Sequence, residues 1–596
     1  MAGSKSQFNS WILKLLVWRI KHISDNNFIL ISAGLIGICS GLAAVTLKSA
    51  VHALIKYLEI GLDLFNFNYL YLVYPLIGIL LTVTVAKYLF RERLGHGITQ
   101  ILYAISKNSS IIRKTRMYSR MVTSAITVGF GGSVGLEAPI VVTGSAIGSN
   151  MARLFHLSYK KRTLLLGCGA AGAISAIFNS PVTGVIFAME VILTEVVISR
   201  FIPLLLASVC GQLVALVLLG EDILFSFKLT DPFEANETGY YIIFAALCGL
   251  ISLYFTRTMY LFEGSIQRIK NDFGRAFVGG ISLALIILTF PPIYGEGYET
   301  IKNLLSGTSE NVFLHSFFYW FSDHELSVII FLVLILLVKP IATALTIGAG
   351  GSGGIFAPSL FMGGLTGYAF SSSFNYLFGT ELSTSNFTLV GMCGVMSGVL
   401  HAPLTAIFLI AEITSGYVLF VPLMLVSAIS FSTISYFEKH SIYTKALIET
   451  GDFIPYDKDR IVLSLIDLSK IIEKDLLVIH PEDTLDDLVK LVKKSKRNIF
   501  PVVNDQVELE GIVTLDDIRE MMFDDESRRN IIIKTIMHQP PANVSTQEKM
   551  QSVMNKFEVT QAWNLPVIDE GKYIGFISKS RIFNAYRKKL IRQSAE

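Results

Sequence analysis

Long apolar runs fill the first three quarters of the chain and stop near residue 445. A helix needs roughly 18–20 apolar residues to cross a bilayer. Runs of about this length cover residues 28–47, 70–90, 201–219, 240–255, 276–293, 327–346 and 417–433. Glycine and proline interrupt three more, at 124–149, 163–193 and 353–378. One soluble core does not need so many runs, so we predict an all-α polytopic membrane domain over residues 27–448.

From residue 449 to residue 596 the pattern is that of a soluble chain, in which short strands alternate with helices. The pattern occurs twice, so we predict an α/β domain of two copies, at about residues 470–525 and 533–590. The matching segments are 483–488, 499–503 and 511–517 in the first copy, and 551–554, 564–568 and 575–581 in the second.

Composition and charge exclude several classes of protein. Only 16% of the 596 residues are charged, and the net charge of +3 is too small to indicate a nucleic-acid partner. The histidines and cysteines are scattered, and acidic residues are few in the apolar runs. A membrane-embedded enzyme and a magnesium transporter are therefore both disfavoured. Basic residues before the first run predict a cytoplasmic amphipathic segment at residues 1–26.

The apolar region contains two copies of one sequence pattern. Residues 135–139 read Gly-Leu-Glu-Ala-Pro, and residues 354–358 read Gly-Ile-Phe-Ala-Pro. Glycines follow five and nine residues after each proline, at Gly144, Gly148, Gly363 and Gly367. Such repeats of broken apolar segments are typical of transporter folds.

A second pair of matching segments follows the first. Residues 175–181 end in a proline and precede Glu190, and residues 397–403 end in a proline and precede Glu412. We expect both glutamates to be structural, paired with helix ends or backbone groups. The separation from proline to proline is 42 residues in the first half and 45 in the second.

A helix that begins inside a membrane leaves its first N–H groups without partners and its positive dipole end in low dielectric. An anion satisfies both, proline suits the first turn, and glycine lets the backbone approach an ion. The two Gly-x-x-Ala-Pro segments therefore predict an anion site near mid-membrane. The alternative is that these glycines serve close helix packing.

These motifs resemble the CLC family of chloride channels and chloride/proton antiporters. Residues 135–139 are similar to the family's Gly-x-Glu-x-Pro signature, and residues 354–358 to its Gly-x-Phe-x-Pro signature. Residues 178–190 match the helix that follows the first signature, and Tyr443 stands at the position of the family's pore tyrosine. The resemblance implies an inverted repeat, a homodimer in the cell membrane with one pore per subunit, and both termini in the cytoplasm.

The resemblance also implies roles for single residues. Glu137 is expected to be the external gate, whose carboxylate competes with chloride or a similar small anion. The backbone N–H groups of Ile355 and Phe356, the Tyr443 hydroxyl and the segment at Gly135 are expected to hold that anion. Dipoles without a full positive charge bind an anion and still release it. The alternatives are a helix cap for Glu137 and a membrane-boundary tyrosine for Tyr443.

The family's usual Gly-Ser-Gly-Ile-Pro reads Gly-His-Gly-Ile-Thr here, at residues 95–99. His96 therefore replaces a serine that contacts the anion, and an imidazole donates one hydrogen bond when neutral or carries a charge when protonated. One hypothesis is that His96 contacts the anion. The other is that it points elsewhere and a backbone N–H takes its place. The change leaves fluoride, nitrate and bicarbonate open as alternative anions.

A second departure concerns protons. Many antiporter members carry an acid directly after the conserved glutamate, as an internal proton relay, and Val191 stands there in this chain. An apolar side chain relays no proton, so Val191 favours channel-like or weakly proton-coupled transport. The alternative is a chloride/proton antiporter in which Glu195 or His96 substitutes for the missing acid.

Each copy in the tail resembles a CBS domain, and such pairs often bind adenine nucleotides through a Thr-x-x-Asp motif. Thr514 and Asp517 fit that motif, whereas the second copy has Ser578 with Arg581 in place of the acid. The resemblance therefore implies one adenine nucleotide near Thr514 and Asp517, and transport itself is expected to need no cofactor. The alternative is a module that stabilises a dimer without a ligand.

Overall fold

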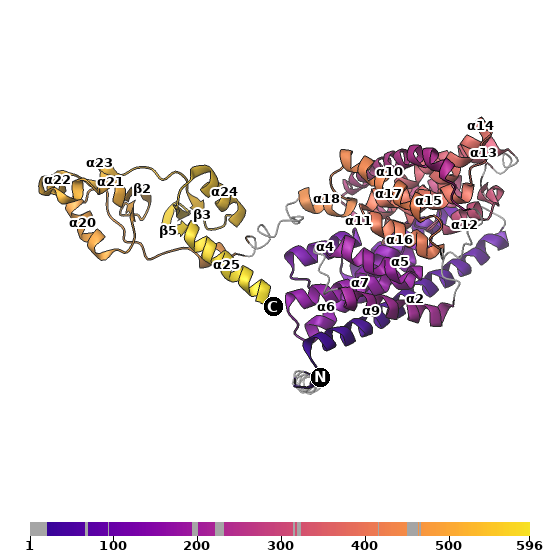
Figure 1. Cartoon of the computed structure of the whole chain (residues 1–596), viewed down its shortest axis with the longest axis horizontal. Helices are drawn as coiled ribbons and strands as arrows, with labels where there is room; N and C mark the ends of the chain where they lie inside the picture. The colour runs from indigo at the N-terminus through magenta and orange to yellow at the C-terminus, as the bar shows by residue number, and fades with distance from the viewer. Residues whose placement is uncertain are drawn as a thin grey trace. The chain divides into compact units, whose positions relative to one another are not determined.

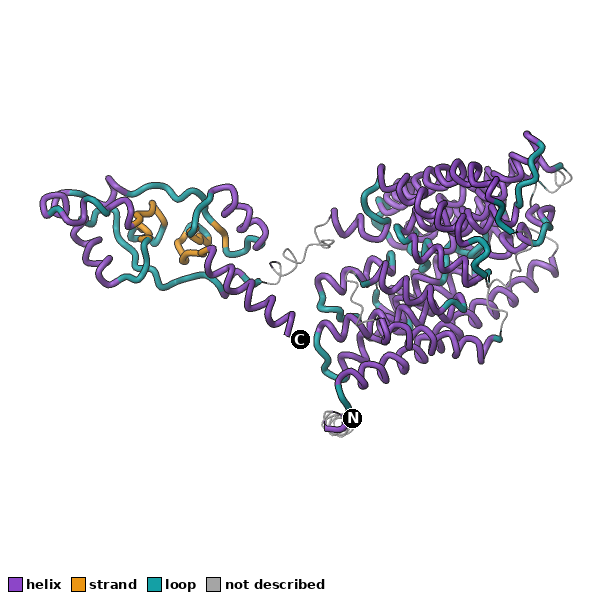
Figure 2. The backbone as a smooth tube through the Cα atoms, in the orientation of Figure 1, coloured by secondary structure: helices purple, strands orange, loops and turns teal. Residues whose placement is uncertain are grey.

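The computed structural model describes residues 19, 21–65, 70–92, 94–193, 201–220, 232–313, 316, 318, 324–414, 416–449, 463 and 466–595. The chain forms two compact units, Met1–Phe453 and Ile454–Glu596 (Figure 1). Among the described residues, the strands all lie in the second unit (Figure 2). The predicted fold class, an all-α membrane domain followed by an α/β domain, is confirmed. The predicted amphipathic segment at residues 1–26 lies largely outside the described residues.

The first unit divides into two halves of similar helix content. The first half contains α2 (Asp25–Phe65), α3 (Leu70–Thr84), η1 (Val85–Phe90), α4 (Gly97–Lys107), η2 (Lys114–Met117), α5 (Ser119–Gly129), α6 (Glu137–Leu154), α7 (Tyr159–Phe178), α8 (Pro181–Phe187), η3 (Ala188–Ile192) and α9 (Phe201–Leu219). The second half contains η5 (Ala235–Glu237), α10 (Thr238–Gln267), α11 (Asp272–Thr289), η6 (Pro291–Ile293), α12 (Tyr298–Leu305), η7 (Ser309–Phe313), α13 (Glu325–Gly348), α14 (Phe356–Phe378), α15 (Thr384–Leu400), α16 (Pro403–Ile413), α17 (Phe420–Phe437) and α18 (Ile442–Glu449).

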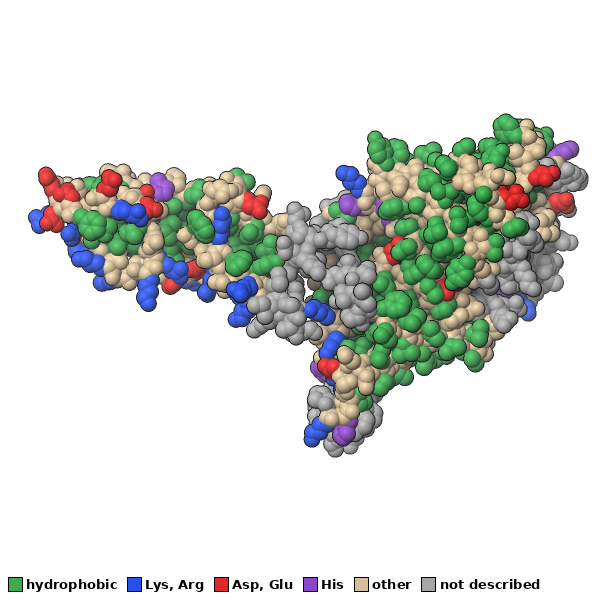
Figure 3. Space-filling model, in the orientation of Figure 1, with side chains coloured by type: hydrophobic (Ala, Val, Ile, Leu, Met, Phe, Trp, Pro, Cys, Tyr) green, Lys and Arg blue, Asp and Glu red, His purple; other side chains and the backbone are tan. Residues whose placement is uncertain are grey.

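The outside of this unit is apolar. Within the described part of the chain, eight helices are long and apolar enough to cross a membrane. Large apolar side chains such as Ile202, Val217 and Ile243 are exposed on them, and Figure 3 shows hydrophobic side chains over most of the visible face. Soluble proteins rarely expose so continuous an apolar surface. The unit is therefore a membrane domain.

Four repeated glycines hold neighbouring helices in backbone contact. A Cβ atom at Gly144 in α6 would lie 2.2 Å from the carbonyl oxygen of Gly169 in α7. A Cβ atom at Gly363 in α14 would lie 2.2 Å from the carbonyl oxygen of Gly391 in α15. Gly148 and Gly367 are equally close to backbone carbonyls one turn further on. For these four glycines, the alternative of close helix packing is confirmed.

Two glutamates cap helices across the two halves. Glu190 in η3 accepts hydrogen bonds from the backbone N–H and the hydroxyl of Thr405, at 2.8 and 2.6 Å, at the start of α16. Glu412 in α16 accepts the same two bonds from Thr183, also at 2.8 and 2.6 Å, at the start of α8. The predicted structural role of both glutamates is confirmed. Each half thus supplies the negative charge that stabilises a helix start in the other half.

The second unit contains η9 (Leu468–Lys470), α20 (Leu485–Lys494), β1 (Ile499–Val503), β2 (Leu509–Thr514), α21 (Leu515–Ile518), η10 (Met521–Phe523), α22 (Asp525–Asn530), α23 (Ile533–Ile536), β3 (Val544–Ser545), α24 (Met550–Thr560), β4 (Asn564–Asp569), β5 (Lys572–Ser578) and α25 (Lys579–Ala595). β1 pairs antiparallel with β2, and β4 lies between parallel β3 and antiparallel β5. Each copy has its own apolar core, one around Phe500 and Val513 and the other around Phe557 and Leu565. The predicted strands at 499–503 and 564–568 are confirmed.

The first helix of this unit begins with a capping box. Thr484 and Asp487 exchange side-chain-to-backbone hydrogen bonds at the start of α20. The Thr484 hydroxyl and the Lys490 ammonium hold the pKa of Asp487 below its ordinary value. Such a capped start is a local feature, because both partners lie within the first turn of the helix.

Candidate functional site

Two helices start from a short bridge in the buried interior of the membrane domain. The Gly135 N–H donates to the Gly354 carbonyl at 2.9 Å, and the Gly354 N–H donates to the Gly135 carbonyl at 2.8 Å. Helix α6 begins at Glu137, and helix α14 begins at Phe356. A Cβ atom at Gly135 would lie 2.8 Å from the Cβ atom of Ala357 and 2.0 Å from the Glu137 carboxylate, so glycine leaves room for both side chains. Two sets of helix-start N–H groups therefore begin at one place.

Glu137 is the first residue of α6, and its side chain is only 1% exposed. Its Oε1 atom accepts a hydrogen bond from the Tyr298 hydroxyl. The backbone N–H groups of Glu137 itself and of Ala357, at the start of α14, also face this carboxylate. A buried carboxylate is costly even with such donors, so stability alone does not account for a glutamate at this place.

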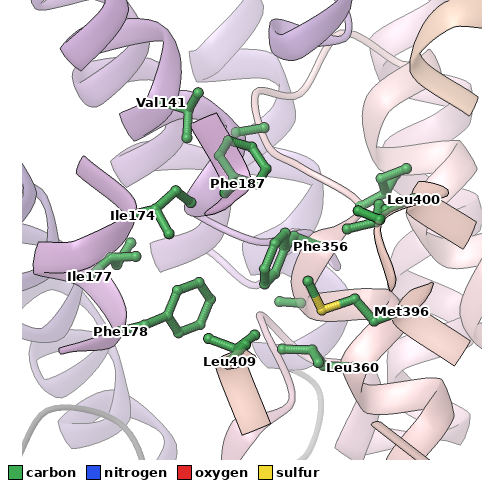
Figure 4. Packing of buried hydrophobic residues seen from close by; sticks show 14 of the residues in the cluster. Val141, Ile174, Ile177, Phe178, Phe187, Phe356, Leu360, Met396, Leu400 and Leu409 are labelled. Carbon is green, nitrogen blue, oxygen red and sulfur yellow. The ribbon is translucent and has the colours of Figure 1, made fainter. Parts of the chain in front are cut away.

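The side chain of Phe356 is anchored away from polar groups. Its ring lies 5.1 Å from that of Phe178 and 6.4 Å from that of Phe187, measured between centroids. Figure 4 shows these rings together among aliphatic side chains from α6, α7, α14, α15 and α16. Ile355, just before the helix, is fully buried. These two residues therefore offer their backbone N–H groups, not their side chains, to anything at the helix start.

Tyr443 in α18 is 2% exposed, and its hydroxyl has no hydrogen-bond partner within the described parts of the chain. Its backbone carbonyl accepts a bond from the Thr99 hydroxyl at 3.0 Å, which ties α18 to α4. The preceding carbonyl, of Ile442, accepts a bond from the Tyr260 hydroxyl, also at 3.0 Å. The Tyr443 side chain interacts electrostatically with Glu137. A buried phenol usually finds an acceptor, so this one is a candidate donor to a bound ion.

His96 precedes α4, and its side chain has a protein partner. Its Nε2 atom lies 2.8 Å from Oε2 of Glu263 in α10, and the two side chains are 22% and 12% exposed. The other oxygen of Glu263 accepts a bond from Gln267 at 2.9 Å. This is the geometry expected if His96 points towards a partner other than the anion. Glu263 was not predicted from the sequence as a partner of His96, although a lone carboxylate in an apolar helix was a usable signal.

Arg120 holds the loop before α4 in place. It belongs to the basic cluster of residues 107–120, yet it is only 2% exposed. Its guanidinium donates to the Gly95 carbonyl at 3.3 Å and to the Gln100 side chain at 2.7 Å. The basic cluster is thus partly structural, because a buried guanidinium needs such acceptors.

Val191 follows Glu190 in η3, is half-buried and packs against the apolar core. The neighbouring Glu190 carboxylate is engaged with α16, as described above. Neither side chain has the free carboxylate that the resemblance assigns to an internal proton relay.

The loop between η6 and α12 lies along the segment that leads to Glu137. The Ser133 hydroxyl donates to the Ile293 carbonyl at 2.8 Å, and the Leu136 N–H donates to the Glu296 carboxylate at 3.1 Å. Tyr298, two residues after Glu296, bonds to Glu137 itself. This loop was not predicted from the sequence to contribute to the site. Its signal was the polar motif Tyr-Gly-Glu-Gly-Tyr, at residues 294–298, between two apolar helices.

In the second unit, Thr514 and Asp517 form a capping box at the start of α21. The Thr514 hydroxyl donates to Asp517 at 2.7 Å, and His538 Nδ1 lies 3.4 Å from the same carboxylate oxygen. In the second copy, the Ser578 hydroxyl accepts the N–H of Arg581 at 3.2 Å. The predicted residues therefore meet as a pair in the first copy, with the Asp517 side chain partly open to solvent.

The chain is similar to known proteins in both of its units. The family model described as voltage gated chloride channel matches residues 77–435. The chain belongs to the CLC family. A second family model, for the CBS domain, matches residues 468–524 and 533–588.

The relatives of this CLC protein carry the names of both channels and exchangers. Chloride channel protein CLC-f of Arabidopsis thaliana is 26% identical over 72% of this chain and 61% of its own length. An H(+)/Cl(-) exchange transporter ClcA of Vibrio parahaemolyticus is 27% identical over 56% of this chain and 70% of its own length. The chain thus spans less than two thirds of the plant relative.

Two solved structures share the fold. One is a slow cyanobacterial Cl−/H+ antiporter, with a TM-score of 0.61 and 20% identity over 71% of this chain and 97% of that one. The other is a eukaryotic CLC transporter, with a TM-score of 0.61 and 19% identity over 93% of this chain and 97% of that one. At this identity the likeness concerns the fold alone.

The pair of His96 and Glu263 predicts a measurable coupling. His96→Ser removes this hydrogen bond and Glu263→Gln removes the charge that strengthens it, so their effects on stability are expected to be non-additive by about 0.5–3 kcal/mol. The measurement is thermal unfolding of the purified wild type, the two single variants and the double variant. Additive losses would contradict the pairing.

Proposed function

We propose that this chain carries chloride or a similar small inorganic anion across a membrane, with Glu137 as the gate. The observation that supports this best is the bridge between Gly135 and Gly354, from which two helices start. Helix-start N–H groups attract an anion without a full positive charge, so the ion binds and still leaves.

In this proposal the anion binds to the N–H groups of Ile355 and Phe356 and to the Tyr443 hydroxyl. The buried hydroxyl of Tyr443, which lacks a partner in the described residues, supports this assignment. Glu137 starts the opposing helix, so its carboxylate competes with the anion for the same positive region. Protonation removes that competition, and the neutral side chain leaves.

His96 acts on the anion indirectly in this proposal. Its Nε2 atom lies 2.8 Å from the Glu263 carboxylate, so the imidazole is directed to that partner and not to the anion. A backbone N–H at the start of α4 then contacts the anion in place of the serine hydroxyl that the family usually has. The charge of the pair then sets the potential at that end of the pathway. An anion other than chloride, such as fluoride, nitrate or bicarbonate, remains the alternative substrate.

Val191 favours channel-like or weakly proton-coupled transport, because an apolar side chain relays no proton. The second candidate is a chloride/proton antiporter. The name of the Vibrio relative, an H(+)/Cl(-) exchange transporter, favours this candidate. From the family resemblance we also propose a homodimer in the cell membrane with both termini in the cytoplasm.

We propose further that an adenine nucleotide binds the tail near Thr514 and Asp517 and regulates transport. The pair of CBS matches and the partly open capping box support this role.

The gate is tested with Glu137→Gln in chloride-loaded liposomes, with valinomycin to balance charge. Wild-type chloride efflux is expected to rise as the outer pH falls from about 8 to about 4, the range in which buried carboxyl groups titrate. The neutral glutamine cannot ionise, so efflux of the variant is expected to stay high and nearly independent of pH. The control is Glu381→Gln, which removes an exposed carboxylate.

The same vesicles carry an internal pH indicator, which separates the two candidate mechanisms. Efflux without stoichiometric proton uptake agrees with channel-like transport, and stoichiometric uptake would establish the antiporter instead. An unchanged pH dependence in Glu137→Gln would contradict the role of Glu137 under either mechanism.

The nucleotide site is tested by calorimetric titration of the whole purified chain with ATP, ADP and AMP. Asp517→Asn is expected to weaken binding at least tenfold, or about 1.4 kcal/mol. The control is Asp487→Asn, because Asp487 occupies the same position in the capping box of α20. Absence of heat in the wild type would leave the tail as a purely structural module, and equal weakening in both variants would contradict a nucleotide site at Asp517.

A further inference from the structure

Glu296 places a second carboxylate at the start of α6. It accepts the N–H of Leu136, the residue directly before Glu137, at 3.1 Å. This N–H is one of the groups that an anion would otherwise meet at this helix start. The hydroxyl of Tyr298, two residues further along the same loop, donates to Glu137. One short loop therefore forms hydrogen bonds with both a backbone N–H and the Glu137 carboxylate at the start of α6.

A buried lysine fixes this loop. Lys339 in α13 is fully buried, and its ammonium group donates to the Ser133 hydroxyl at 2.9 Å. It also donates to the carbonyls of Ile293 and Gly295 at 3.4 and 3.5 Å. Since Ser133 lies four residues before Glu137, the lysine connects the loop with the segment that it covers. Glu296 is thus held in place from α13 and not merely by its own loop.

Charged groups from several elements face Glu296. These are Glu137 at the start of α6, Tyr298 at the start of α12, Lys339 in α13 and Lys48 in α2. Glu137 in turn faces Tyr298, Glu296 and Tyr443. The two carboxylates repel each other when both are ionised, and Lys48 and Lys339 place positive charge beside Glu296. Two acids that interact in low dielectric titrate as a pair.

We propose that Glu296 is a positioning residue of the gate: its negative charge opposes the ionised, closed form of Glu137, while the Tyr298 hydroxyl favours that form. This inference rests on the proposed role of Glu137. A neighbouring negative charge makes a second carboxyl group harder to ionise, and a hydrogen bond to the ionised form makes it easier. The two residues of the loop therefore set, in opposite directions, the pH at which the gate opens.

The test is chloride efflux from liposomes as a function of outer pH. Glu296→Gln removes the repulsion, so Glu137 is expected to stay ionised to lower pH. The proton concentration at half-maximal efflux then rises about tenfold, which is one pH unit. Tyr298→Phe removes the hydrogen bond and is expected to shift the midpoint the opposite way, to higher pH. General damage to the fold does not produce shifts of opposite sign.

The matched control is Glu299→Gln, which removes an exposed carboxylate from the first turn of α12 and is expected to leave the midpoint unchanged. If Glu296→Gln yields too little folded protein, Glu296→Ala removes the same charge and gives the same readout. A midpoint that does not move, or moves to higher pH, in Glu296→Gln or in Glu296→Ala overturns the inference.

Failure of this inference is distinguishable from failure of the proposed function. If Glu137→Gln removes the pH dependence and Glu296→Gln leaves the midpoint in place, Glu296 only supports the loop. If the wild type carries no anion, the proposed function itself is wrong. In the double variant of Glu137→Gln and Glu296→Gln no midpoint is expected, and a surviving midpoint overturns the coupling.

Discussion

Helices that begin inside a membrane domain impose the constraint on which this structure depends, because their first N–H groups need acceptors that lipid does not supply. The protein meets this constraint in two ways. At α8 and α16 the acceptors are the fixed carboxylates of Glu412 and Glu190, each supplied by the opposite half. At α6 and α14 the starts are joined by the bridge between Gly135 and Gly354, Glu296 accepts the Leu136 N–H, and the Ala357 N–H faces the Glu137 carboxylate. The caps at α8 and α16 hold the scaffold, whereas in the proposed function the Glu137 carboxylate is an acceptor that leaves and gives way to an anion.

The sequence was sufficient to predict the elements that depend on local chemistry. Glycine before proline predicted the starts of α6 and α14, and the short strands of the tail were predicted at 499–503 and 564–568. The repeated glutamates were correctly expected to be structural. In each case the residues that decide the structure lie within a few positions of one another or recur at matching places in the two halves.

The sequence did not reveal contacts made between distant segments. Glu263 reaches His96 across 167 residues, and Glu296 reaches the start of α6 across 160. No repeat or spacing in the sequence marks either of these pairs, because tertiary packing alone brings the two groups of each pair together. Arg120 is a further example, because its guanidinium is buried on carbonyl and amide oxygens of the α4 region, which no sequence pattern predicts. Single carboxylates in apolar surroundings were the signal that deserved more weight.

Transport in the proposed function depends on an anion that the start of α14 and the Tyr443 hydroxyl hold together. The most direct measurement is anomalous diffraction from crystals of the whole chain grown in bromide, a heavier substitute for chloride. The account predicts a bromide peak within hydrogen-bond distance of the Phe356 N–H and the Tyr443 hydroxyl. Bromide peaks elsewhere in the membrane domain, with none between these two groups, would contradict it.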